Sequence, residues 1–321
     1  MRARRAALCL ILGVVLLSSC AGSGSPDRSD PASEREEATA TTATTAAAGT
    51  VGSTSPVAPS PANAPASPQV IDLVDPARPV VTNGRTISSS RSLPTTIWRP
   101  SRAGSYPLVV FAHGYRLGPP GYARFCSMLA EAGYVVAAPS FPLADETRRN
   151  GLDRGDIPNE ARDVSFVISA LRASPIASSI SAGPVGVAGH SDGADVALIV
   201  GYQQGLSDPA VGAVVAVAPD AFTAQVSTSR PPLLLVHGDS DATVPYSESV
   251  QVFARVQGSR TFLTLVGADH LPPIADRTVW TAVLDGAVVT FFDATLKKVQ
   301  SLESAQTLMR TLGNSRVQTG A

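Results

Sequence analysis

From about Val70 onward, apolar stretches alternate with amphipathic ones, and this alternation limits the folds open to the chain more than any other feature. The apolar stretches, such as YPLVVFAHG (106–114) and PPLLLVHGD (231–239), have no polar face, as expected of strands that helices cover on both sides. The stretches between them are roughly 10–20 residues long, which suits helices. Strands and helices that alternate in this way form right-handed crossovers. We therefore expect an α/β fold with a mostly parallel central sheet and helices on both faces.

The alternation assigns an element to most of the sequence between residues 85 and 296. Strands are expected at 85–100 (two, around a turn), 106–114, 134–141, 184–191, 211–220, 231–239 and 260–270, and helices at 121–133, 159–174, 192–204, 247–257 and 276–296. Gly133 is expected to close the first helix and Asn159 to open the second. Residues 221–230 alone separate two of the strands, so no large cap domain is expected there.

The first twenty residues have the layout of an export signal. Arginines at positions 2, 4 and 5 precede AALCLILGVVLL, an apolar run that is short for a membrane span. The run ends in Leu17-Ser18-Ser19-Cys20, which resembles the lipobox of bacterial lipoproteins, where the cysteine receives the lipid. We expect an exported lipoprotein, anchored through Cys20 at the outer face of a bacterial cell membrane. An ordinary secretory signal with an incidental cysteine is the alternative.

A stretch rich in Ser, Thr, Ala and Pro follows, from Ala21 to about Gln69. It has too few apolar residues to offset the entropy lost on ordering, so we expect it to be disordered. The expected organisation is a signal peptide over 1–19, the lipidated cysteine and a linker over 20–69, and one α/β domain over 70–321.

Charge and cysteine content narrow the function classes. The chain has 25 Lys and Arg against 26 Asp and Glu, without the clustered basic charge of a nucleic-acid binder. Of the three cysteines, Cys9 leaves with the signal and Cys20 is expected to carry lipid. Cys126 then has no partner for an internal disulfide and is expected to be a buried structural thiol on an apolar helix face.

One serine lies where a predicted strand gives way to a predicted helix, in VGVAGHSDGADVA (185–197). Gly189 and Gly193 flank Ser191 two residues away on each side. A sharp strand-to-helix turn crowds its neighbours, and glycines relieve that crowding and leave the serine hydroxyl exposed. The N-terminus of the following helix favours negative charge near the serine. Asp192 and Asp195 fall in the first turn of that helix, where we expect them to act as caps rather than as catalytic groups.

A catalytic serine in this setting needs an acid and then a histidine later in the chain. Of the four histidines, only His270 follows both the serine and a plausible acid. His190 adjoins Ser191 and is expected to point away from it, while His113 and His237 end predicted strands. The acid lies in HGDSDATVP, which offers both Asp239 and Asp241.

These residues together resemble the α/β-hydrolase superfamily, over roughly Thr86 to Leu296. The likeness is greatest to the dienelactone-hydrolase-like, chlorophyllase-like and polyester-hydrolase-like branch. It implies Ser191 as nucleophile and His270 as base. The family's G-x-x-D-x-x-V-P turn matches Gly238 to Pro245 and implies Asp241 as the acid. The segment FAHGY matches the family's HG segment and implies the backbone N–H groups of Tyr115 and Asp192 as oxyanion donors.

The resemblance implies a carboxylic-ester hydrolase that works through an acyl-enzyme. No cofactor and no metal is expected, because no Cys/His spacing fits zinc and no phosphate-binding loop occurs. An acyltransferase or peptidase with the same triad, and a lipoprotein that only binds a ligand, are the alternatives.

Without a cap, the cleft is expected to take short-acyl or polymeric esters. Tyr115, Phe141 and Tyr246 are candidates to line it, and Trp280 is expected in the core. The charged segment 142–158 is either a solvated loop or a gate over the site.

Overall fold

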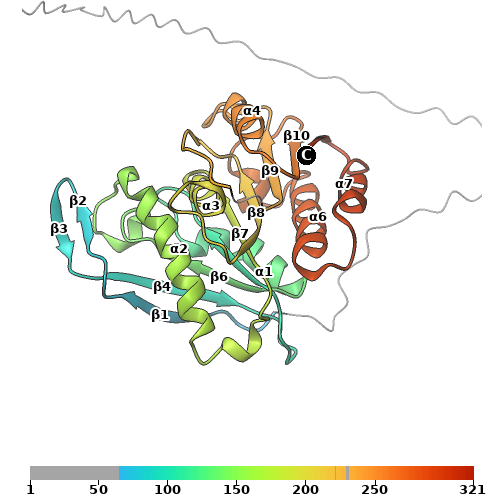
Figure 1. The fold of residues 1–321 in the computed structure, drawn as a ribbon. Helices are drawn as coiled ribbons and strands as arrows, with labels where there is room; N and C mark the ends of the chain where they lie inside the picture. Colours follow the sequence, from blue (N-terminus) through green and yellow to red (C-terminus); the bar gives the residue numbers. More distant parts are fainter. Residues whose placement is uncertain (1–64, 221, 229–230) are drawn as a thin grey trace, which may run out of the picture. The chain divides into compact units, whose positions relative to one another are not determined.

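The structure is a computed structural model, and it describes residues 65–220, 222–228 and 231–321. A nine-stranded sheet of order β1-β4-β6-β5-β7-β8-β9-β10-β11 runs through this part of the chain (Figure 1). The six strands from β6 to β10 in that order pair in parallel. Antiparallel strands flank them, β4 and β1 at one side and β11 at the other. The predicted α/β-hydrolase fold, with its mostly parallel sheet, is confirmed.

The elements follow one another with short connections. The strands are β1 (Gln69–Asp75), β2 (Val80–Thr82), β3 (Arg85–Ser88), β4 (Arg91–Trp98), β5 (Leu108–Ala112), β6 (Val135–Pro139), β7 (Val185–His190), β8 (Val211–Val217), β9 (Leu233–Gly238), β10 (Arg260–Leu265) and β11 (Ser315–Gly320). The helices are α1 (Ala123–Glu131), α2 (Ile157–Arg172), α3 (Asp192–Tyr202), α4 (Tyr246–Arg255), α5 (Pro272–Ala275), α6 (Thr281–Phe292) and α7 (Leu302–Met309). A separate hairpin, β2–β3, extends at the left of Figure 1.

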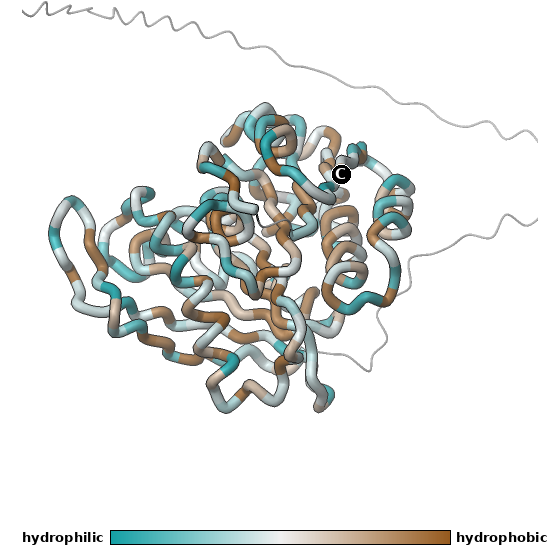
Figure 2. Tube along the Cα trace, viewed as in Figure 1, coloured by the Kyte–Doolittle hydropathy of each residue, from teal (hydrophilic) through white to brown (hydrophobic). Residues whose placement is uncertain are grey.

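Each face of the sheet carries its own hydrophobic core. Along β5, Leu108 and Val110 contribute to the core beneath α2, α3 and α4, while Val109 and Phe111 contribute to the core beneath α1, α6 and α7. This alternation follows from the two-residue period of a strand. It also explains why the central strands read as unbroken apolar runs, which Figure 2 shows together with the hydrophobic α6.

The sequence pattern missed the outer elements of the sheet. β1, α7 and β11 have no predicted counterpart, because β1 and β11 alternate exposed with half-buried residues and lack a continuous apolar run. Two helix starts also differ from the prediction. α2 begins at Ile157, so that Asn159 lies in its first turn, and α6 begins only at Thr281.

Residues 218–232 connect β8 to β9, and within the described part of this connection no helix forms a cap. In the same part of the chain, no helix is long and apolar enough to cross a membrane. The predicted signal peptide and Cys20 lie among residues 1–64, outside the described residues.

Candidate active site

Ser191 sits in a strained turn between β7 and α3. Its backbone has φ 56° and ψ −128°, a region that residues with a side chain rarely occupy. Hydrogen bonds on both sides hold it there: Ser191 N–H donates to Val217 O at 2.9 Å, and Ala194 N–H donates to Ser191 O at 2.7 Å. Strain of this kind persists only where the surrounding structure enforces it, and it is typical of functional sites.

The two flanking glycines are required by close backbone contacts. A Cβ atom on Gly189 would collide with the carbonyl oxygen of Gly193, and one on Gly193 would collide with the carbonyl oxygen of Ala112. The crowding that the glycine spacing indicates is therefore present, and any larger residue at either position would push α3 away from the sheet.

Asp241 and His270 meet at the same edge of the sheet. Asp241 lies in the turn after β9, and its Oδ2 is 2.7 Å from His270 Nδ1. Its Oδ1 accepts the backbone N–H groups of Thr243 and Val244, each at 2.8 Å. With both oxygens engaged and no exposed side-chain surface, the carboxylate is held in one orientation toward His270.

A second histidine also contacts Asp241. His237 Nε2 lies 3.1 Å from Asp241 Oδ2 and 3.1 Å from Val244 O, and both of these atoms can only accept. The proton therefore resides on Nε2, and Nδ1 accepts the hydroxyl of Ser249 at 2.7 Å. Burial lowers the pKa of His237, so the ring is a neutral support for the carboxylate.

Asp239, the other candidate acid, is directed elsewhere. Its Oδ1 accepts Gly267 N–H at 2.6 Å, and its Oδ2 pairs with Arg316 of β11 at 2.7 Å. The Gly267 N–H holds the pKa of Asp239 below its usual range. Of the two acids, only Asp241 contacts His270.

A cavity of about 510 Å³ brings the candidate site residues together. Ser191, His270, Tyr115 and Asp192 all line it, and Asp241 lies behind His270. Within the described residues, the backbone N–H groups of Tyr115 and Asp192 donate to no protein atom, so both remain available to a ligand.

A chlorophyllase family model matches residues 74–249 of the chain. The chain belongs to the chlorophyllase family. It is thus a hydrolase of the α/β type, and the family indicates an ester hydrolase. The match takes in Ser191 and Asp241 and ends before His270. No curated protein matches the chain.

The family match covers the segment 142–158, which is neither solvated nor free. Pro142 to Asp145 and Asp156 are buried. Arg154 reaches the rim of the cavity, where its guanidinium pairs with Asp192 through two hydrogen bonds of 2.5 and 2.8 Å and with Asp220 at 2.5 Å. The capping role expected for Asp192 is wrong, since its carboxylate is engaged by Arg154. The sequence held no signal for this ion pair, whose partners lie 38 residues apart.

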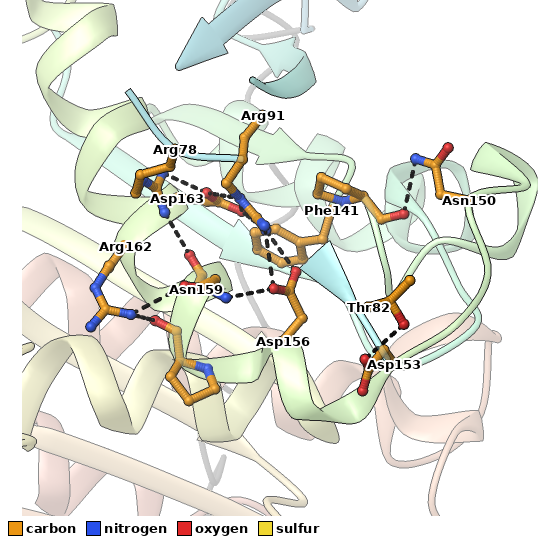
Figure 3. Close-up of polar contacts among 12 residues, drawn as sticks. Arg78, Thr82, Arg91, Phe141, Asn150, Asp153, Asp156, Asn159, Arg162 and Asp163 are labelled. Carbon is orange, nitrogen blue, oxygen red and sulfur yellow. Dashed lines mark hydrogen bonds and ion pairs between the residues drawn. The ribbon is translucent and has the colours of Figure 1, made fainter. Parts of the chain in front are cut away.

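A buried ion cluster fixes the end of this segment to the sheet (Figure 3). Arg91 of β4, with a side chain only 1% exposed, pairs with Asp156 at 2.7 Å and with Asp163 of α2 at 2.6 Å. Asn159 donates to Asp156, and Thr82 donates to Asp153 farther along the segment. These contacts restrain residues 153–156, and with them the position of Arg154 at the cavity.

Glu160 is a buried acid beside this cluster. Its Oε2 has no hydrogen-bond partner among the described residues. Burial raises its pKa well above the usual value, and the carboxylates of Asp156, Asp163 and Asp192 act in the same direction. The folded protein therefore keeps the proton of Glu160 at a pH where the unfolded chain has released it, and stability falls as pH rises above about 4.5.

Glu160→Gln should remove this pH dependence. The amide resembles the protonated acid, so the variant and the wild type should be equally stable near pH 4. The advantage of the variant should then grow by up to about 1.4 kcal/mol per pH unit as pH rises. Urea unfolding at a series of pH values measures the difference. Glu303→Gln, at an exposed position on α7, is the control and should show no such trend. A constant gap at all pH values would contradict a buried, protonated Glu160.

Three aromatic residues differ from their predicted places. Phe141 is fully buried and packs on His113, and Tyr246 stacks on Phe262, so neither lines the cavity. Trp280 precedes α6 and is only partly buried, with its Nε1 donating to Val266 O. The sequence places these residues near strand ends but does not fix the direction of their side chains.

Cys126 is fully buried in α1, and burial raises the pKa of its thiol, as a structural cysteine requires. Across the described ranges, no group of His, Cys, Asp and Glu has the arrangement of a metal site.

Proposed function

We propose that the protein is a serine carboxylic-ester hydrolase with Ser191 as nucleophile, His270 as base and Asp241 as the acid that orients it. The observation that carries the proposal is the 2.7 Å contact from Asp241 to His270 at the wall of the cavity that Ser191 also lines. Membership of an α/β-hydrolase family supports the same reaction class.

In the proposed reaction, His270 takes the proton of the Ser191 hydroxyl as the oxygen attacks the ester carbonyl. Because Asp241 faces Nδ1, the proton of the neutral ring resides there, and Nε2 is free to act as base. The backbone N–H groups of Tyr115 and Asp192 donate to the oxyanion. One such donor contributes about 3–4 kcal/mol in other hydrolases. His270 then returns the proton to the leaving alcohol, and water releases the acyl group by the same steps.

We further propose that the acyl group is short or belongs to a polymer that lies across the cleft. The cavity of about 510 Å³ has apolar walls at Leu117, Val244 and Leu271, but the ion pair of Arg154 and Asp220 lies at its rim. A long acyl chain that extended past the apolar walls would meet these charges or water, and burying charge is costly.

The chain-length dependence of hydrolysis tests this substrate class. Each methylene adds roughly 0.8 kcal/mol of binding only while it meets an apolar wall, so kcat/KM should level off or fall after a few carbons. We expect p-nitrophenyl acetate to hexanoate to be cleaved with higher kcat/KM than the palmitate, with no jump in rate above the critical micelle concentration. A rate that climbs steadily to the palmitate would contradict an open cleft.

Product analysis tests the reaction type. With a short p-nitrophenyl ester and a competing alcohol such as methanol, a hydrolase should give mainly the free acid, whereas an acyltransferase should give mainly the methyl ester. Release of p-nitrophenol with the methyl ester as the main product would favour the acyltransferase alternative.

We also propose that Cys20 carries a lipid that anchors the protein at the outer face of a bacterial membrane. Lipid burial contributes about 0.8 kcal/mol per methylene, and stable anchoring takes more than one chain. Cys20→Ala should move the protein from the membrane fraction to the soluble fraction after cell lysis. Cys126→Ala is the control and should leave the partitioning unchanged. Unaltered membrane association of Cys20→Ala would contradict the proposed anchor.

A further inference from the structure

We infer that Tyr122 and His190 are positioning residues that join the oxyanion turn at Gly114 to the loop of His270 through a continuous chain of hydrogen bonds. The inference rests on the proposed function, because it concerns how His270 is held for the reaction. Neither residue is assigned a role in that reaction by the triad itself.

The chain contains three hydrogen bonds in series. Gly114 N–H lies 3.1 Å from the hydroxyl oxygen of Tyr122, the same oxygen lies 2.9 Å from His190 Nδ1, and His190 Nε2 lies 3.1 Å from the carbonyl oxygen of His270. It begins beside the predicted oxyanion donor Tyr115, passes the residue before Ser191 and ends on the backbone of His270.

The direction of every bond follows from its two ends. Gly114 N–H can only donate, so the Tyr122 oxygen accepts from it. The carbonyl oxygen of His270 can only accept, so His190 carries its proton on Nε2. His190 Nδ1 is then an acceptor, and the Tyr122 hydroxyl donates to it. No other assignment satisfies all three bonds with a neutral ring.

Burial maintains this arrangement. Tyr122 is fully buried and His190 is 1% exposed. Burial lowers the pKa of His190 to about 3, with the neighbouring His270 as a second cause. The ring therefore remains neutral at working pH and keeps its single proton on Nε2. Burial also raises the pKa of the Tyr122 hydroxyl, which stays protonated and able to donate.

His190 additionally provides a wall for His270. The centroids of the two rings lie 4.6 Å apart at an interplanar angle of 46°. The catalytic cycle requires His270 to become positively charged, and a neutral neighbour does not repel that charge. The prediction that His190 points away from the site thus misses its contact with both the ring and the backbone of His270.

The oxyanion turn is packed against the same chain. A Cβ atom on Gly114 would lie 2.9 Å from the Tyr122 hydroxyl and 3.2 Å from His190 O. Removing the hydroxyl therefore frees the Gly114 turn and His190 together, and a small misplacement of reacting groups is enough to lower the rate greatly.

Tyr122→Phe tests the inference, because it keeps the ring that packs on Phe111 and removes only the hydroxyl. We expect kcat on p-nitrophenyl acetate to fall about 10- to 100-fold while KM changes little, since the groups that react are displaced but the cavity walls remain. An unchanged kcat would overturn the inference.

Tyr134→Phe is the matched control. Tyr134 is equally buried in the same hydrophobic core, and its hydroxyl donates to Asp293 at 2.6 Å, away from the cavity. Both variants lose a hydroxyl hydrogen bond, so both should lose some thermal stability, but only Tyr122→Phe should lose kcat. An equal loss of kcat in the two variants would show that Tyr122 acts through general stability and would overturn the inference.

Two substitutions of His190 provide a second test if Tyr122→Phe fails to fold. The amide nitrogen of Gln can take the place of Nε2 and still donate to His270 O, whereas Asn is too short to reach it. We expect His190→Gln to retain more of kcat than His190→Asn. The reverse order would contradict the assigned direction of the chain.

A measurement that needs no substrate separates this inference from the proposed function. The Nδ1 proton shared by His270 and Asp241 should give a low-field resonance in proton NMR, identified by its loss in Asp241→Asn. We expect Tyr122→Phe to broaden or shift this resonance and Tyr134→Phe to leave it unchanged. If wild-type protein hydrolyses no ester, the proposed function fails, while this resonance still decides the inference. An identical resonance in both variants would overturn it.

Discussion

Asp241→Asn should lower kcat by about 10⁴-fold and leave the fold intact, as the equivalent change does in other serine hydrolases. The structure gives a specific reason. Asp241 Oδ1 accepts two backbone N–H groups, from Thr243 and Val244, so the carbonyl oxygen of Asn must take that place. The amide nitrogen then faces His270 Nδ1, where it can only donate. The ring must carry its proton on Nε2 instead, and Nε2 can no longer accept the proton of Ser191.

The neighbouring acid supplies the control. Asp239→Asn changes a side chain that pairs with Arg316 and accepts from Gly267, without contact to His270. It should cost some stability and less than about tenfold in kcat. Steady-state kinetics on p-nitrophenyl acetate compare the two variants. A large loss in Asp239→Asn with a small loss in Asp241→Asn would assign the acid to the wrong residue of this turn.

The central part of the fold follows from the sequence because burial on two faces leaves a simple signature. Val109 and Val110 contribute to different cores, so both must be apolar, and the strand reads as an unbroken apolar run. The edge strands escape this reasoning. β11 has exposed and half-buried residues in alternation and is held by its pairing with β10, a contact that no local pattern encodes.

The candidate site divides in the same way. The glycines around Ser191 are predictable because backbone contacts leave no room for a Cβ atom, a local requirement that the sequence records. Arg154, Tyr122 and His190 are different. Arg154 reaches Asp192 from 38 residues away and Tyr122 reaches His190 from 68 residues away, so their roles depend on tertiary packing. The sequence identifies the segment 142–158 as charged, but the structure pairs Arg154 and Asp156 where free charges were expected.

The identity of the nucleophile is the claim on which the account depends most. A fluorophosphonate reacts with a serine only where a base and an oxyanion site activate it, and the strained Ser191 at the cavity wall is the serine expected to meet both conditions.

Labelling of the intact protein by a fluorophosphonate, followed by mass spectrometry of its peptides, tests this claim most directly. The account predicts one adduct per chain, on the peptide that contains Ser191, and loss of both the adduct and ester hydrolysis in Ser191→Ala. Ser140→Ala, at a buried hydroxyl that donates to Asp145, should be labelled like the wild type. Stoichiometric labelling that survives Ser191→Ala, or an adduct on another serine, would contradict the account.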